Sequence, residues 1–226
     1  MIQKSGERNK MAVLTNTYVL GNLSTNTYVV ENLNNSECLI VDPALADSKF
    51  VNAIEGKTVK YILLTHGHFD HIGGAKRLRD MTGAKIVIHN EDAPMLSDAK
   101  LSLYSLQYPG KGTTPFSADI LVNDGDELEF GDTKIKVMHT PGHTKGGVCY
   151  ILDDDRILFS GDTLFHLSAG RTDFPGGNPR EELMSLAKIA ALEGDYAVYP
   201  GHEASTTLNF ERENNRYMRT RFRNKL

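Results

Sequence analysis

The sequence lacks several features that would place it in a specialised class of protein. It contains no tryptophan and only two cysteines. It also has no apolar run as long as a membrane-spanning helix, which needs about 20 residues. Neither sign of charge predominates, because 25 Lys and Arg residues stand against 29 Asp and Glu residues. We therefore expect a cytoplasmic globular protein that binds neither nucleic acid nor membranes.

The length of 226 residues is enough for one globular domain with a substantial core. Residues 1–10 are polar and show no periodicity, so we interpret them as a flexible extension preceding a single domain at 11–226. Cys38 and Cys149 lie in apolar, strand-like segments far apart in sequence. We predict that both are buried free thiols rather than a disulfide.

Two successive sets of strand patterns, each with accompanying helix patterns, define the predicted fold. Alternating or continuous apolar segments predict strands at 17–20, 27–30, 38–41, 59–65, 85–89, 120–122, 127–130, 134–139, 148–152, 156–159 and 196–199. Helical spacing and capping residues predict helices at 47–54, 75–81, 91–98, 179–192 and from about 206. Such an order suggests two packed sheets covered outside by helices. Residues 100–117 should form a long loop, which we interpret as a substrate lid.

The segment 66–71, His-Gly-His-Phe-Asp-His, directly follows a predicted buried strand. Polar side chains at such a position are costly unless they are paired or coordinate an ion. In an extended segment alternate side chains share a face, so His66 and His68 can bind one cation. Asp70 and His71 follow where the chain turns and can face a second. Imidazole and carboxylate donors at this density suit zinc, iron or manganese.

Four side chains cannot complete two metal sites, so further ligands must come from elsewhere in the chain. The second half offers three candidates next to a glycine at a strand end, namely His143, Asp162 and His202. For the isolated histidines His89, His139 and His166 we favour ordinary structural or surface roles.

These residues give the chain a clear resemblance to the metallo-β-lactamase superfamily, whose five motifs are matched in order from Asp42 to His202. Within it the segment 168–177, Ser-Ala-Gly-Arg-Thr-Asp-Phe-Pro-Gly-Gly, is most similar to the glyoxalase II-like (hydroxyacylglutathione hydrolase-like) enzymes of the short bacterial type. The resemblance implies an α+β fold, a four-layer αββα sandwich, with the metals at one edge between the sheets.

The resemblance also implies a role for each candidate ligand. One metal would be held by His66, His68 and His143, the other by Asp70, His71 and His202, with Asp162 bridging both. Asp42 would support a ligand by resemblance, whereas its position after a strand is also typical of a turn residue. Arg171 is a candidate substrate contact, although an ion pair with Asp173 that orders the loop is the interpretation we favour.

The resemblance predicts hydrolysis of a small thioester such as S-lactoylglutathione or a related acyl-thiol. Two divalent metals, zinc in the first place and otherwise iron or manganese, would share a hydroxide that attacks the carbonyl carbon. The catalytic carboxylates would be Asp70 and Asp162. Since 24 residues follow His202 in this sequence, the glutathione contacts of the larger members should not carry over in full.

Several alternatives remain open at this stage. A mononuclear-iron persulfide dioxygenase shares the Gly-Arg-Thr-Asp-Phe stretch, although Pro175 and the two glycines after it are more similar to the hydrolases. Other non-lactamase hydrolases of the same fold are also compatible.

We disfavour a β-lactamase because the zinc β-lactamases lack the bridging carboxylate of Asp162. A flavodiiron oxygen reductase would be expected to have Glu in place of His68, and a nonenzymatic scaffold would not need an intact ligand set. A nuclease would need a basic patch. The sequence does not define the oligomeric state.

Overall fold

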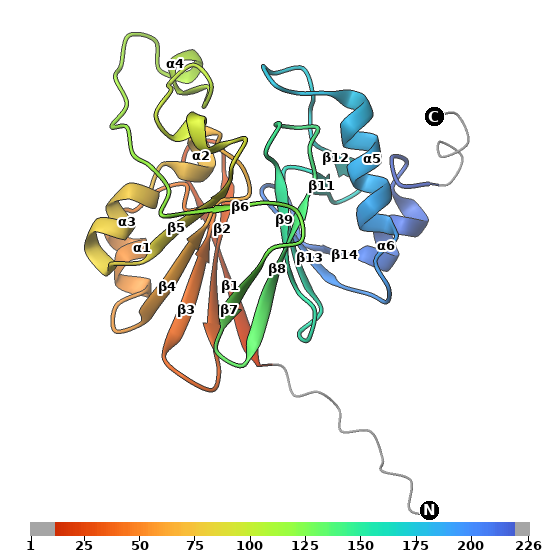
Figure 1. Cartoon of the computed structure of the whole chain (residues 1–226), viewed down its shortest axis with the longest axis horizontal. Helices are drawn as coiled ribbons and strands as arrows, with labels where there is room; N and C mark the ends of the chain where they lie inside the picture. The colour runs from red at the N-terminus through yellow and green to blue at the C-terminus, as the bar shows by residue number, and fades with distance from the viewer. Residues whose placement is uncertain (1–11, 220–226) are drawn as a thin grey trace, which may run out of the picture.

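Two six-stranded sheets form the centre of the molecule in the computed structural model, which describes residues 12–219 (Figure 1). The first sheet has its strands in sequential order: β1 (Val13–Leu20), β2 (Thr25–Asn32), β3 (Glu37–Val41), β4 (Thr58–Leu63), β5 (Lys85–His89) and β6 (Ile120–Val122). The second has the order β14 (Thr206–Thr207), β13 (Ala197–Pro200), β10 (Ile157–Gly161), β9 (Val148–Leu152), β8 (Thr133–His139) and β7 (Glu127–Phe130). A short hairpin pairs β11 (Leu164–Phe165) with β12 (Ser168–Ala169).

Helices cover the outer face of each sheet, as Figure 1 shows. On the first sheet these are α1 (Ser48–Ala53) and α3 (Ala75–Thr82), and on the second α5 (Pro179–Ala190) and α6 (Leu208–Asn214). Three further short helical segments lie along the top of the first sheet: α2 (Phe69–Ile72), the 3-10 turn η1 (Ala93–Leu96) and α4 (Tyr104–Gln107). The predicted α+β class with four αββα layers is confirmed.

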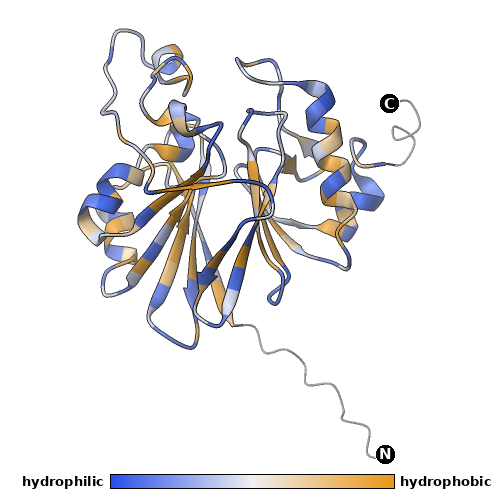
Figure 2. Cartoon of the chain, in the orientation of Figure 1, coloured by the Kyte–Doolittle hydropathy of each residue, from blue (hydrophilic) through white to orange (hydrophobic). Residues whose placement is uncertain are grey.

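Three apolar clusters hold these layers together. The central cluster lies between the two sheets and includes Tyr28, Tyr150 and Phe159, all fully buried. A second cluster joins α1 and α3 to the first sheet, and a third joins α5 and α6 to the second. The strands accordingly carry long apolar stretches where they cross the interior (Figure 2). Burial on both faces explains why several strands are continuous apolar runs rather than alternating ones.

Parallel pairing brings several strand ends to one edge. In the first sheet β3 to β6 are parallel, and in the second β10 pairs in parallel with β13. The carboxyl ends of parallel strands meet at the same side of a sheet, which is where sites form in open α/β sheets. Six of the seven candidate ligands follow such ends, and His143 follows β8, which is antiparallel to β9 and therefore runs in the same direction as β10.

The structure differs from the sequence-based expectations at short elements. The helix expected at 91–98 is only the single turn η1, and the loop at 100–117 contains the one-turn helix α4. The strands β11, β12 and β14 have two residues each and were not predicted. Elements this short carry too few residues to show a period.

Several other expectations concern the chain as a whole. Both cysteines are buried and free, as predicted. No helix within residues 12–219 has the length and apolarity to cross a membrane. The extension expected at residues 1–10 lies outside the described residues, so its flexibility stays a prediction.

Candidate metal centre

The seven candidate ligands come together at one edge of the two sheets, although they are distributed over most of the chain. His66 and His68 lie in the turn after β4, and Asp70 and His71 lie on α2. The second sheet contributes the remaining three from the segments that follow β8, β10 and β13, namely His143, Asp162 and His202. The first sheet thus supplies four side chains and the second supplies three.

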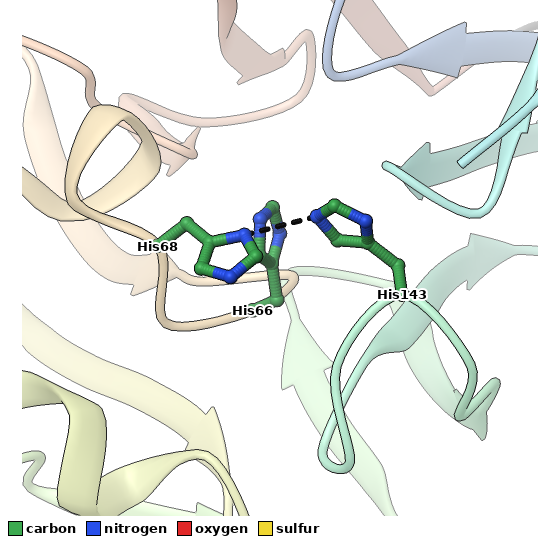
Figure 3. A group of neighbouring side chains, drawn as sticks. All are labelled: His66, His68 and His143. Atoms are coloured by element: carbon green, nitrogen blue, oxygen red, sulfur yellow. Dashed lines mark hydrogen bonds between the residues drawn. The ribbon is translucent and has the colours of Figure 1, made fainter. Parts of the chain in front are cut away.

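Three histidines converge in the first group (Figure 3). One ring nitrogen from each of His66, His68 and His143 lies within 4.8 Å of the others. The Nδ1 atom of His68 is 2.9 Å from Nε2 of His143. The Nε2 atoms of both His66 and His68 are buried without a hydrogen-bond partner in the described part of the chain. Buried polar atoms are nearly always paired, so these orphaned nitrogens point to a missing ligand.

Asp70, His71 and His202 form the second group. Their donor atoms also lie within 4.8 Å of one another. The Oδ2 atom of Asp70 is 3.3 Å from Nε2 of His202 and 3.5 Å from Nε2 of His71. The hydroxyl of Thr25 donates to the same Asp70 oxygen at 3.1 Å and fixes the carboxylate.

The Asp162 carboxylate lies between the two groups. Its Oδ2 atom is 3.5 Å from Nε2 of His143 and 3.6 Å from Nε2 of His202. Its Oδ1 atom is 3.4 Å from Nε2 of His71 and is buried without a hydrogen-bond partner among residues 12–219. One carboxylate therefore reaches members of both groups.

Asp42 fixes the orientation of His71 from behind. One of its oxygens accepts a hydrogen bond from the Thr65 N–H at 2.8 Å, and the other accepts from the Thr65 hydroxyl at 2.6 Å. This second oxygen is also 3.0 Å from Nδ1 of His71. Because a carboxylate can only accept here, Nδ1 carries the proton and Nε2 is free to face the site. The structure thus shows Asp42 as a support of His71 and not merely as a turn residue.

A backbone carbonyl orients His143 in the same way. The Nδ1 atom of His143 donates to the carbonyl oxygen of Arg171 at 2.7 Å, which leaves its Nε2 pointing toward His68 and Asp162. The side chain of Arg171 is exposed instead, and forms two hydrogen bonds of 2.7 Å with Asp173. Its guanidinium lies over the Phe174 ring at 4.0 Å.

Asp92 connects the ligand loops of the two sheets and was not singled out from the sequence. Its carboxylate accepts from the N–H of Gly67 at 3.1 Å, from the Thr144 hydroxyl at 2.8 Å and from the Gly146 N–H at 2.7 Å. Burial raises the pKa of this carboxyl group above its usual range. Its place after β5, beside other strand ends, is the one signal that sequence reasoning could have used.

A second support that the sequence did not reveal holds the loop of His202. The Asn26 side chain donates to the carbonyls of Pro200 and Glu203, at 3.0 and 2.8 Å. The Tyr28 hydroxyl donates to the same Pro200 carbonyl at 2.5 Å. Residues of β2 in the first sheet thus anchor a ligand loop of the second.

The electrostatics of the site suit neutral imidazoles and a bound cation. Burial, reinforced by the neighbouring histidines, holds the pKa of His66 and of His68 well below the ordinary value. Both are therefore neutral, which is the form that binds metals. Burial opposes charging of His71 as well, but the carboxylates of Asp162, Asp70 and Asp42 raise its pKa to about 10. The second group thus stabilises one positive charge at Nε2 of His71, which is a proton on that nitrogen or a cation that takes the place of the proton.

The donor set fits borderline transition metals better than calcium or magnesium. Imidazole and carboxylate donors in a mixed set are typical of zinc, iron and manganese sites, whereas the harder ions prefer oxygen alone.

Of the other histidines, His89 and His139 stack on each other with ring centroids 4.1 Å apart. Neither forms a described contact with the seven candidates. His166 stacks on Phe210.

An αββα sandwich with a histidine and carboxylate cluster at the sheet edge defines a class of candidate metalloproteins. The family model described as the metallo-beta-lactamase superfamily matches residues 20–202. The chain belongs to this superfamily.

Named relatives are similar over most of the chain. A probable metallo-hydrolase from Bacillus subtilis is 35% identical over 188 residues, which cover 82% of this chain and 89% of the relative. A hydroxyacylglutathione hydrolase from Brucella abortus is 39% identical over 181 residues, which cover 75% of this chain but only 62% of that protein.

Solved structures show the same fold. The BLEG-1 B3 metallo-beta-lactamase superimposes with a TM-score of 0.84 at 35% identity, covering 91% of this chain and 99% of that one. TTHA1623 in a di-iron-bound form gives 0.76 at 31% identity, with coverage of 89% and 98%. ETHE1 from Myxococcus xanthus gives 0.74 at 26% identity, with coverage of 90% and 83%.

Proposed function

We propose that this protein is a metal-dependent hydrolase that cleaves thioesters, with S-lactoylglutathione or a related acyl-thiol as substrate. The position of Asp162 carries the proposal, because its two oxygens face both groups of candidate ligands. A carboxylate in this position is suited to join two cations of like charge. The similarity to the Brucella hydroxyacylglutathione hydrolase supports the choice of a thioester.

In this proposal the two groups hold two divalent ions. His66, His68 and His143 hold one, Asp70, His71 and His202 hold the other, and Asp162 bridges them. Zinc is the ion we favour, and iron or manganese would suit the same donors. When bound, such a pair polarises a substrate carbonyl and activates water near neutral pH.

The accessible members of the site indicate the side from which a substrate approaches. The side chains of Asp70 and Asp162 are 12% and 11% exposed and that of His202 is 23% exposed, whereas His71 is fully buried. Substrate and water therefore reach the two catalytic carboxylates from the side of His202. Asp70, held by Thr25, would both bind metal and orient the attacking water.

A thiolate leaving group is also compatible with the side chains near the candidate metal centre. A thiolate leaves without strong protonation, and the hydroxyls of the two buried tyrosines near the cluster, Tyr28 and Tyr150, donate to the carbonyl oxygens of Pro200 and Leu64 instead. At the rim, Arg171 uses Nε and one terminal nitrogen for Asp173. Its other terminal nitrogen forms no hydrogen bond within the described residues, and we assign it to a carboxylate of the substrate.

The alternative function is that of a mononuclear-iron persulfide dioxygenase. It is favoured by the stretch Gly170 to Phe174 and by the structural similarity to ETHE1 from Myxococcus xanthus. Such an enzyme would use a single iron and consume oxygen.

A panel of thioesters assayed by thiol release tests the proposal. Both cysteines of the protein are buried, so a thiol reagent reports substrate turnover with little background. We expect turnover of S-lactoylglutathione or a small acyl-thiol and about two metal ions per chain. An active form with one iron that consumes oxygen with glutathione persulfide would replace the hydrolase assignment. Hydrolysis of a chromogenic cephalosporin without thioester turnover would indicate a lactamase instead.

A further inference from the structure

A cavity of about 520 Å³ lies beside the candidate metal centre and is not part of it. Residues of α2, of α3 and of the segment that runs from η1 through α4 to Phe116 line it. In α2, Phe69 and Ile72 line this cavity, whereas Asp70 and His71 of the same helix belong to the metal centre. The two sites therefore share one helix but use different side chains of it.

The walls of this cavity are mostly apolar and well supported. Besides Phe69 and Ile72, its apolar lining comes from Met81, Met95, Leu96 and Phe116. The Phe69 ring contacts the rings of Tyr104 and Tyr108 edge-on, at centroid distances of 6.3 and 5.9 Å. The Phe69 N–H donates to the Ser102 carbonyl at 2.9 Å. These contacts fix the segment that forms the outer wall.

The charged groups at the cavity leave one cation unpaired. Lys76 forms an ion pair with Asp80 at 2.5 Å, and both line the cavity. Arg77 lines it too, and its guanidinium has no hydrogen bond, ion pair or ring contact in the described part of the chain. The charges of the lining side chains therefore sum to one positive charge, located on Arg77.

We propose that this cavity binds an amphiphilic anion with an apolar acyl or aryl body and a single carboxylate. The apolar body would lie among Met81, Met95 and Phe116, and the carboxylate would pair with Arg77. The volume lies within the range of about 300–1,000 Å³ that is usual for small-molecule sites. An apolar lining with a few polar groups is also typical of such sites. This binding does not depend on the proposed hydrolase activity.

Methionine-methyl NMR gives a readout at the cavity itself. The chain has seven methionines, of which Met81 and Met95 line the cavity, while Met138 and Met184 lie on the other sheet and on α5. The zinc-loaded protein, labelled at its methionine methyl groups, would be titrated with decanoate. We expect saturable shifts of the Met81 and Met95 signals and unchanged signals from Met138 and Met184.

Two arginine variants test the role of charge. Arg77→Gln should weaken decanoate binding about tenfold, the loss expected for a charge-assisted hydrogen bond, and should leave the binding of 1-decanol unchanged. Arg180→Gln removes an exposed arginine on α5 whose side chain has no described partner, and should have no effect.

Three results would overturn the proposal. They are the absence of saturable shifts, shifts spread over all methionines, and equal weakening by the two arginine variants. The thioester assay reports separately on the hydrolase, so failure of one proposal leaves the other open.

Discussion

Asp162 is the residue on which the proposed two-metal arrangement depends. Its carboxylate contacts His71, His143 and His202, which belong to both groups. Asp162→Ala should retain the fold and lose at least one metal equivalent. Thioester turnover should fall by more than about a hundredfold, since loss of an outer partner of a metal ligand alone costs about 10- to 100-fold.

Metal analysis, circular dichroism and the thiol-release assay would measure these effects together. Retained turnover with two bound metals would exclude the bridging role. Asp154→Ala is a suitable control, because Asp154 is an exposed aspartate in the turn between β9 and β10.

Asp42 gives a second prediction at the scale of a residue. It has a backbone φ of +47°, a conformation in which Asn is tolerated better than Ala. Asp42→Ala should reduce metal affinity or activity about 10- to 100-fold, because His71 loses the acceptor that fixes its tautomer. Asp42→Asn keeps the backbone preference, so it separates loss of the carboxylate from backbone strain. Equal metal affinity in all three proteins would contradict the support role.

Glu182 on α5 gives a prediction about pH. The N–H groups of His143 and Gly170 face its carboxyl group, but neither oxygen forms a hydrogen bond of normal geometry within residues 12–219. Burial raises its pKa from 4.5 to about 9. Between these two values the folded protein binds more protons at this group than the unfolded chain does. The contribution of Glu182 to stability therefore falls as pH rises through this window.

Glu182→Gln removes this titration. Relative to that of the natural protein, the free energy of unfolding of this variant should increase as pH rises between these two values, by up to about 1.4 kcal/mol per pH unit. Urea unfolding at a series of pH values would measure the difference. Glu181→Gln, at the less buried neighbouring position on α5, is the control for loss of a carboxyl group from this helix. A constant difference across the window would show that Glu182 is ionised in the folded protein.

At the scale of elements, the turn that carries His66 and His68 packs tightly against η1. A Cβ atom at Gly67 would lie 2.5 Å from the Cβ and 2.8 Å from the sulfur of Met95. Gly67→Ala should therefore destabilise the protein by about 1–3 kcal/mol, as overpacking does, and should weaken metal binding by shifting His66 and His68. Thermal unfolding and metal titration would measure both effects.

Two further variants separate local crowding from a general effect of replacing glycine. Gly112→Ala has open space around the added methyl group and should be nearly neutral. Met95→Gly combined with Gly67→Ala should restore part of the lost metal affinity, because it removes both the Cβ atom and the sulfur that crowd the added methyl group. If the double variant binds metal no better than Gly67→Ala alone, Met95 is not the source of the effect.

The sequence predicted the long elements and the strand-end positions of the ligands, because burial and turn chemistry are local signals. The helix expected at 75–81, for example, is observed as α3, and Gly83 follows it with φ of +74°. The one-turn helix α2 has no such signal. The contacts of Asp92 with Thr144 and Gly146 join segments 52 and 54 positions apart, and only the packing of the two sheets brings them together.

At the scale of the whole molecule, metal binding should be linked to global stability. The candidate ligands come from segments of both sheets, so the complete donor set exists only in the folded protein. At a free metal concentration about 100 times the dissociation constant, binding would add about 2.7 kcal/mol to the free energy of unfolding. Removal of metal by a chelator should lower the unfolding temperature, and zinc should restore it.

Thermal unfolding followed by circular dichroism would measure this linkage. Magnesium added in place of zinc is the control, since the donor set does not suit it. An unfolding temperature that is unaffected by chelation of a protein shown to contain metal would contradict the proposed coordination by both sheets.

The distribution of the ligands also has a consequence for the order of events during synthesis. His71 and His202, whose Nε2 atoms are 3.4 Å apart in the folded protein, are separated by 131 positions in the chain. The first four ligands leave the ribosome long before the last one is translated. In the proposed arrangement a nascent chain that lacks His202 has an incomplete second group, and the centre is complete only after β13 has joined its sheet.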